Sequence, residues 1–203
     1  MINKSIIPVL AIAIGLLSFT KPTNDPIAIG ADMPGAEVSL KSVSGKNINL
    51  KNSAQKNGIL IMFSCNTCPY VIKNQKRTAE ICAYALKNNI GVVVINSNEA
   101  LRNGDDSYDE MVAYAKEQGY QWDYVVDENS ALANAFGANR TPESFLFNNN
   151  LKLVYHGAID DSPADETAIT RAHLQIAINE LTAGKDITIN KSRSVGCTIK
   201  RKN

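Results

Sequence analysis

Two cysteines spaced C-x-x-C lie where an apolar strand gives way to a helix. The motif Cys65–Pro69 follows the continuous apolar run Gly58–Ser64, which has the length of a strand buried on both faces. From about residue 66 to 88 the pattern is helical. A cysteine in the first helical turn faces unpaired backbone N–H groups and the positive end of the helix dipole. Both favour the thiolate, which is the nucleophile, so we expect Cys65 to be reactive and Cys68 to resolve a mixed disulfide on it.

The length and composition indicate one globular domain. The chain has 203 residues, of which 44% are hydrophobic and 20% are charged, so it is long enough to bury a core. Four cysteines are too sparse for a small disulfide-stapled scaffold. Lys+Arg 21 against Asp+Glu 20 argues against a general nucleic-acid binder.

The N-terminus is typical of a secretory signal peptide. Residues 1–20 contain a lysine, a short apolar run and then small and polar residues. The apolar run is shorter than the roughly 20 residues of a spanning helix. We therefore expect an exported protein, periplasmic or extracellular, with a retained N-terminal membrane anchor as the alternative. Export would place the cysteines where disulfides persist.

The rest of the chain divides into three predicted parts. Residues 21–34 contain three prolines and no periodicity, which indicates a linker. Residues 35–189 form the predicted domain. Residues 190–203 form a basic C-terminal tail that contains Cys197, with five basic side chains and no acid.

Within the domain, strands and helices alternate and are followed by a hairpin and a helix. This order predicts an α/β fold with a mixed central sheet flanked by helices. The expected strands are 37–40 and 47–50 as an N-terminal hairpin, 58–64, 91–95, 124–126, and 143–147 with 151–155 as a second hairpin; the expected helices are 66–88, 108–118, 130–136 and 165–183.

Other roles for the cysteine pair fit less well. Cys82 lies 14 residues beyond Cys68 on the same predicted helix, roughly 21 Å away, so the two cannot share a zinc ion or a disulfide. Haem attachment would need a histidine where Pro69 stands. A purely structural role for a Cys65–Cys68 disulfide is a further alternative, although a bond within one helical turn would cross-link almost nothing that is not already ordered. Cys82 shares a helical stripe with Ile72, Gln75, Ala79 and Leu86, which favours a buried small hydrophobe.

A second motif, Arg140–Glu143, directly precedes the strand of the second hairpin. Together with C-x-x-C it resembles the thioredoxin superfamily, and specifically its peroxiredoxin-like branch (alkyl hydroperoxide reductase/thiol-specific antioxidant, redoxin). That group carries C-N-x-C-P-Y/F, T-P-E/D-x-F-L-F, Y-x-G-x-I-D-D and G-C-x-I-K, which stand here in order at 65–70, 141–147, 155–161 and 196–200.

The resemblance implies an extended thioredoxin fold with an inserted strand–helix unit within residues 90–136. It also implies that Pro142 is a cis-proline facing the cysteines. Thr141, the residue before it, would then line a substrate groove in which the substrate pairs as an added strand.

The chain departs from this family pattern in two ways. The peroxidase motif P-x-x-x-T/S-x-x-C is absent, because Gly58 and Met62 stand seven and three residues before Cys65. The buried acid that thioredoxins place in the strand before the active site is also missing, since Ile59–Phe63 is wholly apolar.

Two residues are auxiliary candidates. Arg140 either lies beside Cys65 and lowers its pKa or is a solvated loop arginine. Cys197 is either a third redox cysteine that folds back and exchanges with Cys65, or a free or externally paired thiol on the tail.

These features predict an exported thiol–disulfide oxidoreductase with Cys65 as nucleophile and Cys68 as resolving cysteine. It would act on protein or small-molecule disulfides, take electrons from a thiol donor that can be membrane-borne, and need no cofactor or metal. One alternative is a thiol peroxidase acting through Cys65. Another is a non-catalytic binding module or a copper carrier using Cys65, Cys68 and one of the two histidines, His156 and His173.

Overall fold

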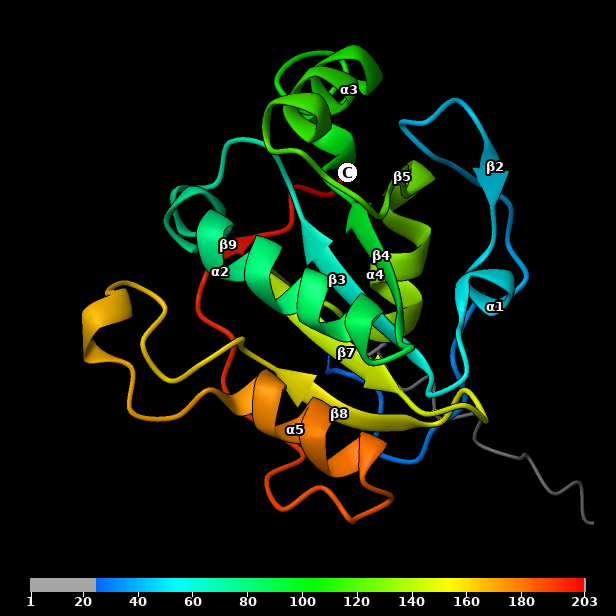
Figure 1. The fold of residues 1–203 in the computed structure, drawn as a ribbon. Helices are drawn as coiled ribbons and strands as arrows, with labels where there is room; N and C mark the ends of the chain where they lie inside the picture. Colours follow the sequence, from blue (N-terminus) through cyan, green and yellow to red (C-terminus); the bar gives the residue numbers. More distant parts are fainter. Residues whose placement is uncertain (1–24, 203) are drawn as a thin grey trace, which may run out of the picture.

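A mixed sheet of five strands forms the centre of the computed structural model, which describes residues 25–202 (Figure 1). The predicted signal peptide lies outside the described residues. The strand order is β5 (Asp123–Val126), β4 (Gly91–Asn96), β3 (Ile59–Ser64), β7 (Glu143–Phe147) and β8 (Leu153–Gly157). β3, β4 and β5 are parallel, whereas β7 is antiparallel to both β3 and β8. The predicted mixed α/β sheet of an extended thioredoxin fold is confirmed.

Helices cover both faces of this sheet, as Figure 1 shows for α2 in front and α4 behind. The first face is covered by α2 (Pro69–Lys87), α3 (Tyr108–Glu117) and α5 (His173–Thr182). The second is covered by α1 (Leu50–Ser53) and α4 (Ala131–Phe136). The short elements are β1 (Leu40–Lys41), β2 (Asn47–Ile48), β6 (Arg140–Thr141), β9 (Cys197–Thr198), η1 (Glu99–Leu101), η2 (Glu128–Ser130) and η3 (Glu166–Ala168).

Side chains of β3 alternate between two cores because successive residues of a strand point to opposite faces. Leu60 and Met62 pack in the core that α2 closes, whereas Ile61 and Phe63 pack against α4. The continuous apolar run therefore fills both faces of a central strand, as predicted. Cys82 of α2 is fully buried in the first core, which confirms its packing role.

The predicted helical stripe around Cys82 is wrong at Ile72, whose side chain is 58% exposed. The buried face of α2 instead includes Val71, Thr78, Ile81 and Ala85. At 3.6 residues per turn, Ile72 lies about 80° around the helix from Cys82, whereas Val71 lies within about 20° of it, so Val71 and not Ile72 points inward. The helix itself begins at Pro69 rather than at residue 66.

The last predicted helix is shorter than expected. Residues 165–172 form η3 and a loop, and α5 begins only at His173. The carboxylates of Asp161 and Asp165 accept bonds from the backbone N–H groups of Thr170 and Thr167, which competes with a continuous helix. In the second hairpin, β8 begins at Leu153 rather than at residue 151, after a turn in which Leu151 has a φ of 56°.

Both terminal segments pack onto the domain. In the predicted linker, Ile27 N donates to Phe136 O and Gly30 N donates to Leu153 O, and Met33 is buried. In the predicted tail, Ser192 N donates to His156 O beside β8, and Ile199 is buried in the core of the second face. Among the described residues, no helix combines the length and the apolar character that a bilayer crossing requires.

Candidate functional site

The cysteine motif and the proline loop meet where β3 ends and α2 begins. Cys65 directly follows β3, and Cys68 is the N-cap residue of α2, with Pro69 in the first helical position. The Thr141–Pro142 peptide bond is cis, as the family resemblance implied. Cys65 Sγ lies 3.5 Å from Thr141 Oγ1, and Cys68 Sγ lies 3.3 Å from the Thr141 carbonyl oxygen. The fold therefore brings together the two predicted cysteines and the two predicted groove residues.

A disulfide joins Cys68 to Cys197, with a Cα–Cα distance of 6.0 Å. Cys65 and Cys82 are free thiols. Cys197 lies in β9, which pairs antiparallel with β6 so that Cys197 stands opposite Thr141. The predicted fold-back of Cys197 is thus present, but its partner in this structure is Cys68 rather than Cys65.

The thiol of Cys65 is less acidic than the sequence suggested. Burial raises its pKa, since only 1% of the residue is exposed, and the negative charge of Asp106 raises it further. The Thr141 hydroxyl and the backbone N–H groups of Thr67 and Cys68 act in the opposite direction. The expected helix-terminus effect is present, but in this arrangement desolvation outweighs it.

A buried acid, Asp106, lies close enough to Cys65 for its charge to raise the pKa of the thiol, and no sequence motif indicates it. One carboxylate oxygen accepts bonds from Asn66 N at 2.9 Å and Asn96 Nδ2 at 2.7 Å, and the other accepts from Asn98 Nδ2 at 2.8 Å. Tyr124 donates to the Asn66 side chain at 2.9 Å. This network fixes the first residue after Cys65 and places a negative charge near the thiol. Asp106 lies in the polar loop before α3, and the sequence of this loop does not differ from that of an ordinary solvent-exposed loop.

Arg140 does not lie beside Cys65. The residue is exposed, and its guanidinium donates to Thr198 Oγ1 at 3.0 Å on β9. Its backbone is held instead by buried Glu143, whose Oε2 accepts from Asn139 N at 2.7 Å and Arg140 N at 2.9 Å. The other oxygen of Glu143 lies 2.7 Å from His156 Nε2. Glu143 thus fixes the backbone that precedes Pro142.

His156 is therefore engaged by a carboxylate rather than directed at the cysteines. Within residues 25–202, no three His, Cys, Asp or Glu side chains are grouped as a metal ion would require.

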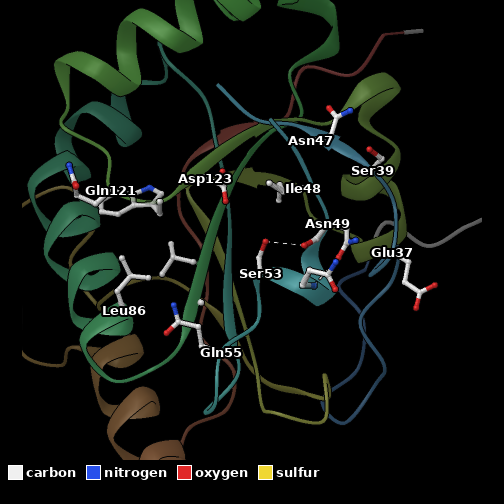
Figure 2. Close-up of a pocket in the computed structure, with 14 residues that line it drawn as sticks. Glu37, Ser39, Asn47, Ile48, Asn49, Ser53, Gln55, Leu86, Gln121 and Asp123 are labelled. Carbon is white, nitrogen blue, oxygen red and sulfur yellow. Dashed lines mark hydrogen bonds between the residues drawn. The ribbon is translucent and has the colours of Figure 1, made fainter. Parts of the chain in front are cut away.

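A separate pocket of about 530 Å³ lies near the N-terminal hairpin (Figure 2). Figure 2 shows around it side chains of Asn47 in β2, Asn49 at the N-cap of α1, Gln121 before β5 and Asp123, the first residue of β5. Gly91, the first residue of β4, also lines it. Cys65 follows the other end of the parallel strand β3, so the pocket and the cysteine site lie at opposite ends of the sheet.

Two solved structures of similar length share this fold at substantial identity. An uncharacterized conserved protein from Geobacillus kaustophilus is 31% identical, with a TM-score of 0.79 over 86% of this chain and 93% of that one. A hypothetical protein from Sinorhizobium meliloti 1021 is also 31% identical, with a TM-score of 0.77 over 88% and 97%. A secreted Mycobacterium tuberculosis disulfide oxidoreductase shares the fold alone, at 11% identity and a TM-score of 0.52 over 73% and 96%. No curated protein matches the chain.

The family comparison agrees with the geometry. The Redoxin family matches residues 28–173, a range that contains the C-x-x-C motif, the cis-proline and all five strands of the central sheet. The chain belongs to the Redoxin family, whose thioredoxin-fold members are thiol oxidoreductases or thiol peroxidases.

Proposed function

We propose that this protein is a thiol–disulfide oxidoreductase that uses Cys65 and Cys68 as its redox pair. The Cys65 thiolate attacks one sulfur of a substrate disulfide, forms a mixed disulfide and releases the other sulfur as a thiolate. The Cys68 thiolate then attacks Cys65 Sγ and releases the second substrate thiolate. Two electrons pass to the substrate, and Cys65–Cys68 becomes a disulfide that a thiol donor must reduce.

One observation carries this proposal: the sulfur atoms of Cys65 and Cys68 both contact Thr141, directly before the cis-proline. Two sulfurs that share one backbone edge are placed to pass a disulfide between them and a strand bound there. The absence of the peroxidase motif before Cys65 supports disulfide exchange over peroxide reduction.

The signal-like N-terminus supports export as part of the proposal. In a periplasmic or extracellular setting the electron donor would be another thiol protein, with a membrane-borne one as a natural source. The substrates would be protein or small-molecule disulfides.

The test is a redox titration of the full chain. The protein is equilibrated in graded mixtures of reduced and oxidised glutathione, its thiols are trapped, and each cysteine is mapped by mass spectrometry. We expect a reversible transition that involves Cys65 and Cys68. Cys82→Ala, which removes a buried thiol outside the site, should retain the transition, whereas Cys65→Ser should abolish reduction of a glutathione-linked peptide disulfide.

Two results would contradict the proposal. The first is that neither Cys65 nor Cys68 exchanges with reduced or oxidised glutathione in any of the mixtures. The second is a stopped-flow reaction of Cys65 with hydrogen peroxide far faster than that of an ordinary thiol, which would favour the peroxidase.

A further inference from the structure

The C-terminal segment Gly196–Ile199, called the strap from here on, occupies the backbone edge beside the cis-proline. Cys197 and Thr198 pair antiparallel with Thr141 and Arg140, and Ile199 N donates to Asn139 O at 3.1 Å. In Figure 1 the C-terminal segment passes the beginning of α2, where β9 lies. A strand on this edge brings its cysteine to Cys68 Sγ, and here that cysteine is the chain's own Cys197.

The edge accepts the strap only because glycine precedes Cys197. A Cβ atom on Gly196 would lie 2.1 Å from the Thr141 carbonyl oxygen and 3.3 Å from Pro142 N. These neighbours are backbone atoms next to the active-site cysteines, so they have little room to move. The residue before the cysteine is therefore restricted by contact with the groove itself.

With the strap in place, a polypeptide substrate has no path to the nucleophile. Cys65 is 1% exposed and Cys68 is 4% exposed. Thr141, whose backbone would pair with a substrate strand, is already paired with Cys197.

The strap is also anchored on both sides of Cys197. Before it, Ser192 Oγ accepts from Ala158 N at 2.9 Å and lies 2.7 Å from the Tyr155 hydroxyl. After it, Lys200 N donates to Asn98 Oδ1 at 2.8 Å, and Arg201 donates to Ala138 O at 2.6 Å. A segment tethered in this way has a high effective concentration at the edge, so a free strand competes poorly for the edge while the strap is bound there.

We propose that the strap is an internal occupant of a site for extended polypeptide disulfides, and that Cys65 releases it by thiol exchange. The Cys65 thiolate attacks Cys68 Sγ, which forms the Cys65–Cys68 bond, breaks the Cys68–Cys197 bond and leaves Cys197 as a thiolate that takes up a proton. No net electrons are gained or lost. Reduction of Cys65–Cys68 by a thiol donor then leaves both cysteines ready for a substrate strand with glycine before its cysteine. This inference rests on the proposed oxidoreductase function and names its substrate class.

The test uses synthetic peptides of residues 193–201 whose cysteine carries a glutathione disulfide, with glycine or valine before that cysteine. Each peptide is mixed with the reduced full-length Cys197→Ser variant, and the mixed disulfide and released glutathione are followed by mass spectrometry. We expect the glycine peptide to react about tenfold faster, because valine would overlap the Thr141 carbonyl. The variant Gly196→Val/Cys197→Ser, whose strap no longer fits the edge, should react faster still.

A second measurement follows the strap in the otherwise native chain. In Gly196→Val we expect the Cys68–Cys197 disulfide to lose population to Cys65–Cys68 by about tenfold at a fixed glutathione ratio. Gly104→Ala is the matched control, since a Cβ there meets only Leu101 O at 3.9 Å.

The possible failures are distinguishable. Equal rates for the two peptides, together with an unchanged disulfide distribution in Gly196→Val, would overturn the strap inference. The proposed oxidoreductase function would still stand if Cys65 and Cys68 exchange with glutathione. Absence of any exchange with either peptide or with glutathione would overturn the proposed function and the inference together.

Discussion

At the residue scale, the reactivity of Cys65 depends on opposing influences on a single sulfur atom. Burial and Asp106 raise the pKa of the thiol, whereas the Thr141 hydroxyl lowers it. Below its raised pKa the group stays a thiol, so its reaction with an electrophile is slow at neutral pH and accelerates as the pH rises. Release of the strap would expose Cys65 to water and reduce the contribution of burial.

Thr141→Val tests the hydroxyl contribution, because valine keeps the shape of the side chain and removes the Oγ1 atom that lies 3.5 Å from Cys65 Sγ. The pKa of Cys65 should rise further, so iodoacetamide labelling at about pH 8 should be several-fold slower and its pH profile should shift upward. The matched control is Thr198→Val, whose hydroxyl bonds Arg140 instead of the thiol. Labelling as fast as in the native chain would show that the Thr141 hydroxyl has no influence.

At the scale of elements, a buried ion pair ties α2 to the segment after β8. Arg77 donates to Asp160 Oδ2 at 2.6 Å, and the two side chains are only 7% and 3% exposed. The same guanidinium donates to Ser162 O at 2.9 Å and Pro163 O at 3.1 Å. One side chain thus fixes the irregular loop that replaces the first part of the last predicted helix.

Arg77→Met should lower the free energy of unfolding by about 3–5 kcal/mol, because it leaves a buried carboxylate without its partner. The adjacent Lys76→Met is the matched control. Lys76 and Glu166 lie 3.4 Å apart but are 68% and 50% exposed, so the loss there should stay under about 1 kcal/mol. Urea unfolding of both variants provides the comparison, and equal losses would contradict the structural role of the buried pair.

At the scale of the whole molecule, Tyr155 connects the sheet to the C-terminal segment. Its hydroxyl donates to Ala158 O at 2.6 Å and lies 2.7 Å from Ser192 Oγ. Burial raises the pKa of Tyr155 to about 12, above the value of about 10 for an unfolded phenol. The folded chain therefore keeps this proton to a higher pH than the unfolded chain.

This difference predicts alkaline destabilisation. Above about pH 10 the unfolded state releases the phenolic proton first, so the stabilisation by neutral Tyr155 is fully present below that pH and is lost between about pH 10 and 12. Tyr155→Phe should reduce the slope of unfolding free energy against pH in this range. Both chains carry Cys65→Ser, because the Cys65 thiolate that forms at high pH would otherwise attack the Cys68–Cys197 disulfide. Identical slopes with and without Tyr155 would contradict the assignment, and the stability of both chains at neutral pH is the control.

Local sequence patterns were sufficient to predict most strands of the central sheet and most of the helices that flank it. The apolar runs that became β3 and β4, the C-x-x-C at the start of a helix and the strand of residues 143–147 all depend on neighbouring residues. The observed N-terminal hairpin is shorter than the predicted one, because α1 begins at Leu50, where the second strand of the hairpin was predicted to end. The cis-proline followed from the family motif rather than from local physics, since most X–Pro bonds are trans.

Local sequence patterns were therefore sufficient to predict the fold class and the position of Cys65 and Cys68 at the end of a buried strand, and the family resemblance added their proximity to Thr141 and Pro142. Which cysteines are joined depends on long-range contacts that these patterns do not contain. Disulfide pairing requires Cα atoms within about 7 Å, and the pairing of β6 with β9 supplies this for two cysteines 129 residues apart. Long-range contacts likewise direct Arg140 to Thr198 and bring the charge of Asp106 near the Cys65 thiol.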